Sequence, residues 1–171
     1  MATGNNEKLA VFLHRAKGSV DAAARAVEQA LDDAELFVFG ELLQLETVKA
    51  VSVFGRWRVG SSLEIAGVQL ADGEHEKTFK QLELLAYGTF ADWKANPSAL
   101  GDLNEARLRK LKQLSLVSLA ESARTLPYAK LLTDLDIANA GDLEELVVSC
   151  IYSELILAAL DQKRQQVEVQ V

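Results

Sequence analysis

Residues able to perform chemistry are few in this sequence and lie far apart. Its two histidines are His14 and His75, and its one cysteine is Cys150. A zinc site needs three or four converging ligands, and the sequence has no His-x-His pair or comparable cluster. No glycine-rich phosphate loop follows a strand pattern, and no nucleophile lies in an elbow motif. We therefore predict no enzyme and no metal or cofactor site.

These isolated residues fit structural positions better than catalytic ones. His14 falls near the C-terminus of a predicted helix, and His75 falls in a glycine-rich stretch that is typical of a solvated loop. Cys150 lies in the apolar run 146–151, so we expect a buried thiol; a reactive thiol would need electropositive, partly exposed surroundings. A single cysteine excludes an internal disulfide and fits a reducing compartment.

The size and the charge of the chain argue against further classes of function. The chain has 171 residues with 49% hydrophobic residues, enough for one domain or two joined halves with a sizeable core. Its formal net charge of −7 argues against a general nucleic-acid binder, which neutralises phosphates with clustered Lys and Arg. No membrane-spanning run and no signal-peptide pattern is present, so we expect a soluble intracellular protein.

Helical spacing dominates the first part of the chain. Apolar residues recur every three or four positions in residues 7–16 and 20–31, and Gly18 and Ser19 between them suit a helix end and an N-cap. This pattern predicts an antiparallel helix hairpin. A third helix is predicted from about residue 35 to residue 45.

The helical spacing of apolar residues is interrupted in the middle of the chain. A short fourth helix is predicted over 47–51, and the glycine-rich residues 52–77 predict a loop or a small irregular hairpin. A further helix is predicted over 78–94. It would contain Gly88, which costs about 1 kcal/mol relative to alanine in a helix interior, so we expect another helix to approach closely there.

The remaining elements are organised around a long helix predicted from residue 104 to about residue 124. Asn104 is its expected N-cap, and residues 114–120 are almost wholly apolar, so we expect that half to be buried on every side. Pro127 suits the first position of the next helix, and Asn139 suits the N-cap of a third.

The C-terminal residues predict a β-hairpin. Residues 155–160 are short and apolar, 161–165 are polar, and 167–171 alternate strictly. Helix, helix, helix, hairpin is the order of a winged helix. The predicted fold class is mostly α, with a helical-repeat part over 1–102 and a winged helix over 103–171.

Winged helices often bind DNA through the third helix, so a nucleic-acid-binding module is an alternative function. Residues 131–154 carry acidic side chains and no Lys or Arg, which would repel phosphates. The tryptophan of residues 56–58, flanked by two arginines, could stack on a base, but a loop-packing role is the default. A basic turn could bind phosphate, although a solvated helix end or a protein-partner surface fits the acidic total better. This turn comprises Arg107, Arg109, Lys110 and Lys112.

Six short motifs, in order along the chain, resemble subunit seven of the COP-9 signalosome. That family is built on the PCI domain, which it shares with subunits of the proteasome lid and of eukaryotic initiation factor three. A PCI subunit of one of these two assemblies is therefore the alternative that the resemblance leaves open. The resemblance runs from about residue 37 to residue 169. Its motifs are VFGELL (38–43), AYGTFADW (86–93), KLKQLS (110–115), LPY (126–128), DLEEL (142–146) and LDQ (160–162).

The resemblance implies helical repeats that lead into a winged helix. It implies a non-catalytic scaffold subunit, located in the nucleus and cytoplasm, of the complex that removes the ubiquitin-like protein Nedd from cullins. Residues 52–77 are longer than the corresponding family connection, and family members continue into a further helix beyond the wing. The resemblance therefore implies a shortened chain or a short isoform.

The predicted function is binding by shape rather than catalysis. The hairpin would leave an edge strand with open backbone groups, and such strands pair readily with another chain. PCI subunits also associate through their winged-helix ends, so the resemblance implies other signalosome PCI subunits as partners. No small-molecule substrate or membrane is expected. The predicted interface residues are Leu157, Leu160, Val167, Val169 and Val171.

Overall fold

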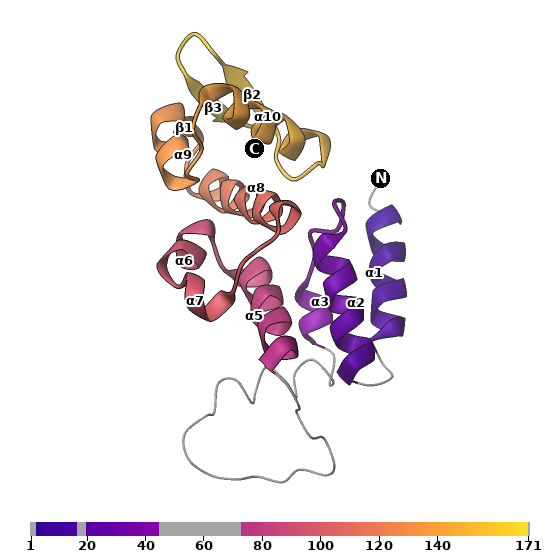
Figure 1. Ribbon diagram of the computed structural model, residues 1–171. Coiled ribbons are helices and arrows are strands. Elements are labelled where there is room, and N and C mark those ends of the chain that lie inside the picture. Colours follow the sequence, from indigo (N-terminus) through magenta and orange to yellow (C-terminus); the bar gives the residue numbers. More distant parts are fainter. Residues whose placement is uncertain (1–2, 17–19, 45–72, 171) are drawn as a thin grey trace. The chain divides into compact units, whose positions relative to one another are not determined.

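The computed structural model describes residues 3–16, 20–44 and 73–170 (Figure 1). It divides into two compact units. The first comprises Met1–Ala86 with Ser98–Gly101, and the second comprises Tyr87–Pro97 with Asp102–Val171. The predicted 102/103 boundary stays a prediction, but residues 87–97 group with the C-terminal unit.

Two helices open the first unit. Helices α1 (Thr3–Arg15) and α2 (Val20–Asp32) lie side by side, as the predicted hairpin requires (Figure 1). The predicted apolar face of α2 is buried at Ala23, Ala24, Val27 and Leu31. Gly18 and Ser19, the predicted connection, lie outside the described residues.

The third predicted helix is much shorter than expected. Helix α3 covers only Gly40–Leu43. The Asp33 carboxylate accepts a hydrogen bond from the backbone N–H of Glu35 at 2.9 Å, and this local turn competes with helix formation. Leu36 and Phe39 are buried from irregular chain rather than from a helix. The predicted fourth helix, over 47–51, lies outside the described residues.

The helix predicted over 78–94 is two helices. Helix α5 (Gly73–Tyr87) begins inside the predicted loop, whose residues 52–72 lie outside the described residues, so His75 is helical rather than in a loop. Helix α6 (Phe90–Ala95) follows a capping box. Thr89 Oγ1 accepts from Asp92 N at 3.4 Å, and Asp92 Oδ2 accepts from Thr89 N at 2.8 Å. Gly88 therefore lies between helices, and the expected close helix approach is not needed.

A long helix supports the second unit. After the short α7 (Pro97–Leu100), helix α8 covers Glu105–Ser122. Its predicted N-cap is confirmed, because Asn104 Oδ1 accepts from Arg107 N at 2.8 Å. Burial is centred on Leu111 and Leu116, whereas Ser118 is exposed. The prediction that residues 114–120 are buried on all sides is therefore wrong; this stretch packs on one side.

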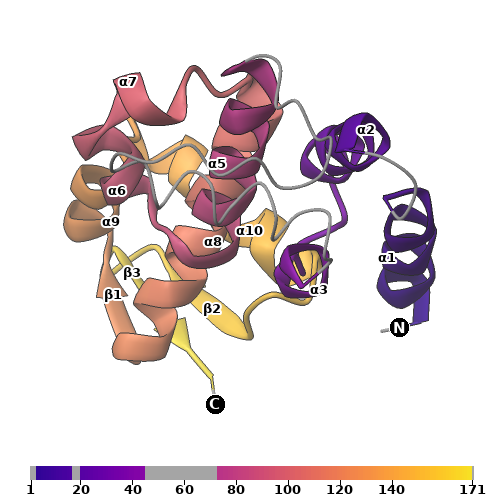
Figure 2. The ribbon, with the colours of Figure 1, turned by 90° about the horizontal axis from the view of Figure 1, so that it is seen from below.

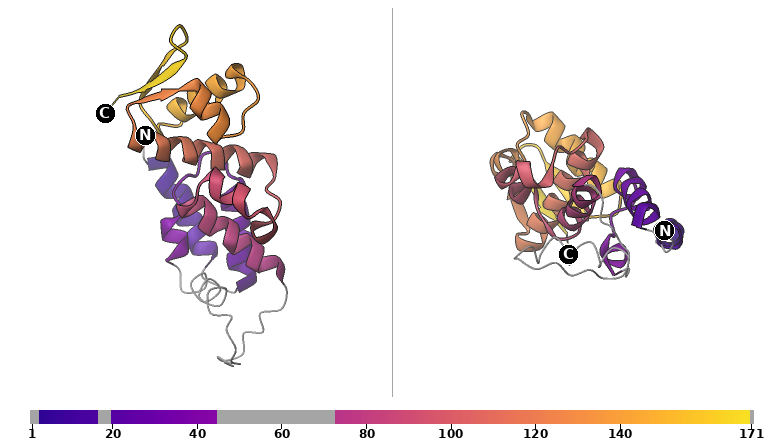
Figure 3. Two further views of the ribbon diagram at one scale, coloured as in Figure 1. Left: turned by 90° about the vertical axis from the view of Figure 1, so that its left-hand side faces the viewer. Right: turned by 60° about the horizontal axis from the view of Figure 1, so that its bottom comes forward.

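The end of the chain is a winged helix. Strand β1 (Thr125–Pro127) leads into α9 (Tyr128–Asp134) and α10 (Ala140–Tyr152), and the wing consists of β2 (Ala158–Asp161) and β3 (Gln166–Val169). The antiparallel sheet has the order β1-β3-β2, visible in Figure 2. The turn between β2 and β3 extends beyond α9 and α10 (Figure 3, left).

The helices of the winged helix also follow the prediction closely. Pro127 is the N-cap of α9 rather than its first residue. The predicted N-cap Asn139 is confirmed, because its Oδ1 accepts from Asp142 N at 2.8 Å. Strand β1 was not predicted, and it places β3 in the middle of the sheet. Within the described residues, no helix is long and apolar enough to cross a membrane.

Candidate functional site

The candidate chemical residues do not converge. His14 lies exposed in the last turn of α1, and His75 lies in the first turns of α5. Across residues 3–16, 20–44 and 73–170, no group of three or more His, Cys, Asp or Glu side chains is arranged to hold a metal ion.

Cys150 is a core residue of the winged helix. It lies on the buried face of α10 and is fully buried, as its apolar surroundings in the sequence predicted. Burial raises the pKa of its thiol to about 12, although the nearby Arg109 partly opposes this shift. The thiolate is the nucleophilic form, so this cysteine is unreactive near neutral pH.

The basic turn of α8 does not form a phosphate patch. Lys110 is 3% exposed, so its side chain belongs to the interior. Arg109 Nη2 pairs with Glu145 Oε1 at 2.8 Å. Lys112 Nζ donates to the carbonyl oxygen of Asp136 at 3.1 Å and lies 5.1 Å from the centroid of the Phe90 ring. These residues therefore hold the unit together. The other basic candidate, residues 56–58, lies outside the described residues.

The third helix of the winged helix is tied to the wing by a carboxylate. Glu144 on α10 accepts one hydrogen bond from Tyr128 Oη at 3.0 Å and another from Gln162 Nε2 at 2.8 Å. Burial, followed by the hydrogen bond to Glu144, raises the pKa of Tyr128 to about 12. In a DNA-binding winged helix this helix would face phosphates. Here it presents carboxylates, which phosphates repel.

The predicted interface residues occupy very different environments. Leu157 is 69% exposed, and Leu160 and Val169 are half-buried. Val167 is 0% exposed, because β3 is the central strand and its side chain fills the core. The expectation that Val167 lies on a free strand edge is therefore wrong. Val171 lies outside the described residues. The interface itself remains a prediction.

The wing nevertheless retains an open edge, formed by β2 instead of β3. Gln170 N donates to Leu157 O at 2.7 Å, so residues 157 and 170 form a hydrogen-bonded pair. Along an antiparallel ladder, hydrogen-bonded and non-hydrogen-bonded residue pairs alternate. Ala159 and Asp161 therefore bond to β3, whereas the backbone groups of Ala158 and Leu160 point away from it. No other strand in the described part of the chain pairs with β2. These backbone groups can pair with a strand from another protein.

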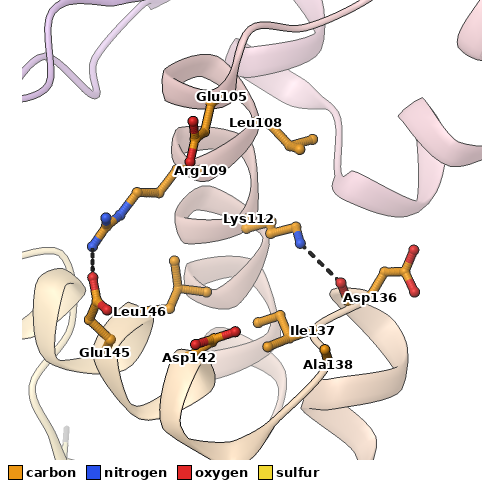
Figure 4. Close-up of a pocket in the computed structure, with 10 residues that line it drawn as sticks. All are labelled: Glu105, Leu108, Arg109, Lys112, Asp136, Ile137, Ala138, Asp142, Glu145 and Leu146. Atoms are coloured by element: carbon orange, nitrogen blue, oxygen red, sulfur yellow. Dashed lines mark hydrogen bonds and ion pairs between the residues drawn. The ribbon is translucent and has the colours of Figure 1, made fainter.

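A pocket of about 440 Å³ lies on the winged-helix unit (Figure 4), and no residue of the wing lines it. It is bounded by the first half of α8, the α9–α10 turn and the start of α10. Because its walls are separated by more than 20 residues in the sequence, no local motif predicted it. The lining residues are Glu105, Leu108, Arg109, Lys112, Asp136, Ile137, Ala138, Asp142, Glu145 and Leu146.

Comparison with known proteins identifies this architecture. A PCI domain matches residues 91–171, which covers the winged helix and the α6 segment that packs with it. Residues 91–171 form a PCI domain. The PCI fold predicted from the motifs is thereby confirmed, with its helical N-terminal part and winged-helix end.

Relatives of this PCI protein extend the match to nearly the whole chain. It is 35% identical over 168 residues to COP9 signalosome complex subunit 7a of Pongo abelii, covering 98% of this chain and 54% of the relative. It is 36% identical over 177 residues to subunit 7 of Drosophila melanogaster, covering 99% of this chain and 57% of the relative. The subunit 7 of Dictyostelium discoideum is 32% identical over 170 residues, with coverages of 99% and 58%. The chain thus spans little more than half the length of these relatives.

Proposed function

We propose that this chain is a non-catalytic scaffold subunit of the COP9 signalosome, the complex that removes Nedd from cullins. The similarity to subunit 7 sequences over 98–99% of the chain is the observation that supports this most strongly. That similarity includes the N-terminal helices, which the PCI match does not cover. A PCI domain over residues 91–171 suits a role in assembly.

Assembly would use the open edge of the wing. The backbone N–H groups of Ala158 and Leu160 are available to a strand from a neighbouring PCI subunit, and the exposed Leu157 adds apolar area beside that edge. Main-chain hydrogen bonds would supply affinity, and flanking side chains would supply specificity. The same proposal places the chain in the nucleus and cytoplasm.

Two substitutions test the open edge. Ala158→Pro removes a backbone donor that faces away from β3, and proline is tolerated on edge strands. Leu157→Glu places a charge at an exposed apolar position. Each variant should lose co-purification with partner PCI subunits when the candidate subunits are co-expressed, while its helical circular dichroism stays unchanged. Ala158→Ser keeps the backbone donor and serves as the matched control.

The wider function is tested with the reconstituted complex. A complex that contains the wild-type chain should cleave Nedd from a neddylated cullin, and Ala158→Pro should reduce the yield of active complex. Assembly of Ala158→Pro and Leu157→Glu at wild-type levels would refute the edge contact. Failure of the wild-type chain to join signalosome subunits would refute the function as a whole.

A further inference from the structure

The pocket beside α8 combines apolar and acidic walls (Figure 4). Leu108, Ile137, Ala138 and Leu146 supply apolar surface, and the remaining lining residues are charged. A volume of about 440 Å³ lies within the range of pockets that hold ligands, and it is large enough for one long side chain.

The charges of the pocket are unequal. Four carboxylates and two cations line it, which leaves a net charge of −2. Lys94 lies outside the lining and pairs with the Asp136 carboxylate at 3.2 Å. Glu105 and Asp142 have no cation within ion-pair distance among the residues the structure describes. The Asp142 carboxylate accepts only from the neutral amide of Asn139, at 2.9 Å.

Both lining cations are already engaged. Arg109 bonds to Glu145, and Lys112 donates to a backbone carbonyl while its ammonium group lies over the Phe90 ring. Burial lowers the pKa of Lys112, whereas the carboxylates of Asp136 and Asp142 oppose this shift. An anionic ligand would have to displace one of these contacts. A cationic group can instead approach Glu105 and Asp142 without displacing any of them.

We propose that this pocket binds a lysine or arginine side chain from a basic segment of a partner protein. The aliphatic stem of such a side chain would pack on the apolar lining residues. Its charged head would lie at the Glu105 carboxylate or at the Asp142 carboxylate, which line opposite ends of the pocket in Figure 4. Long cationic side chains commonly bury their stems in this way while the head stays hydrated. The pocket shares no residue with the wing edge, so this contact is independent of the proposed subunit assembly.

The test measures binding of labelled peptides to the full chain by fluorescence anisotropy. The probe is a fluorescein-labelled Gly-Ser peptide that carries a pair of arginines, compared with peptides in which citrulline or glutamate replaces arginine. The arginine peptide should bind, and raising the salt concentration should weaken it, because exposed charges are screened. Glu105→Gln and Asp142→Asn should weaken binding about three-fold each and about ten-fold together, as for partly exposed ion pairs.

Matched controls separate the pocket from the general negative charge of the protein. Glu121→Gln lies on the same helix as Glu105, and Asp134→Asn lies on α9; both side chains are exposed and neither lines the pocket. These variants should bind as the wild type does. In amide NMR spectra the peptide should shift the signals of Ala138 and Leu146.

Several outcomes would overturn the proposal. Equal weakening by the pocket and control variants would show diffuse attraction, and equal binding of the citrulline peptide would show that charge is not recognised. Preferential binding of the glutamate peptide would reverse the assignment. Ala158→Pro should leave peptide affinity unchanged, so failure of the pocket is distinguishable from failure of the wing contact.

Discussion

Ser115 illustrates how one buried hydroxyl can join two helices. Its Oγ accepts a hydrogen bond from the backbone N–H of Phe90 at 2.7 Å and donates to the carbonyl oxygen of Leu111 at 2.7 Å. The residue is 4% exposed, so water cannot easily replace it. The first backbone N–H of α6 therefore depends on a side chain from α8.

Replacing this hydroxyl should destabilise the winged-helix unit. In Ser115→Ala the Phe90 N–H stays buried without a partner, which costs about 1–3 kcal/mol in the free energy of unfolding. Ser118→Ala is the matched control, because Ser118 lies on the same helix and bonds only to Leu114 O at an exposed position. It should change stability by less than about 0.5 kcal/mol. Urea unfolding followed by circular dichroism measures both, and equal losses would contradict this role.

The roles of individual residues were predicted best for the helix N-caps. Asn104 and Asn139 each bond to a backbone N–H three residues ahead, so their role depends on local chain alone. Lys110 could not be placed in this way. It lies in a run of basic residues, yet it is buried in the folded unit.

Among the secondary-structure elements, the sheet contains both a part that the local sequence pattern predicts and a part that it does not. The β2–β3 hairpin was predictable because a polar turn separates two short apolar or alternating segments. Strand β1 has only three residues and ends at Pro127, and it pairs with residues about 40 positions later in the chain. Nothing local signals such a pairing, so β3 was expected at an edge when it lies in the centre. The pocket escaped prediction for the same reason.

The central position of β3 makes its two valines unequal. Val167→Glu would bury a charge in the core and should cost about 4 kcal/mol or more, enough to unfold many domains. Val169→Glu alters a half-buried position and should cost about 1 kcal/mol. Urea unfolding gives both values. Cys150 supplies a second readout, because its buried thiol should react with a thiol reagent only when the unit opens.

The comparison of these two variants also serves as a control for the interface experiments. Loss of partner binding in Val167→Glu would report unfolding rather than a lost contact, so it cannot stand in for Leu157→Glu. Equal stability of Val167→Glu and Val169→Glu would show that β3 lies at an edge after all.

At the scale of the whole molecule, residues 87–97 belong structurally to the winged helix. Phe90 is hydrogen-bonded through its N–H to Ser115, its ring lies under Lys112, and Lys94 pairs with Asp136. From the sequence, everything before residue 103 was assigned to the helical-repeat part. The helical spacing of residues 78–94 predicts a helix, but it does not say which core that helix joins.

This grouping predicts where an independently stable fragment begins. A fragment of residues 87–171 retains α6 and should unfold cooperatively, whereas 103–171 loses the contacts of Phe90 and Lys94. The shorter fragment exposes apolar surface that Phe90 covers, and loss of a large buried aromatic side chain typically costs about 3–5 kcal/mol. Within the 87–171 fragment, Phe90→Ala should reproduce most of that loss of stability. Lys94→Ala breaks only an exposed ion pair, so it should cost less than about 1 kcal/mol.

Urea unfolding and the rate of Cys150 labelling measure the difference in stability between the two fragments. Equal stability would instead place α6 outside the folding unit of the winged helix.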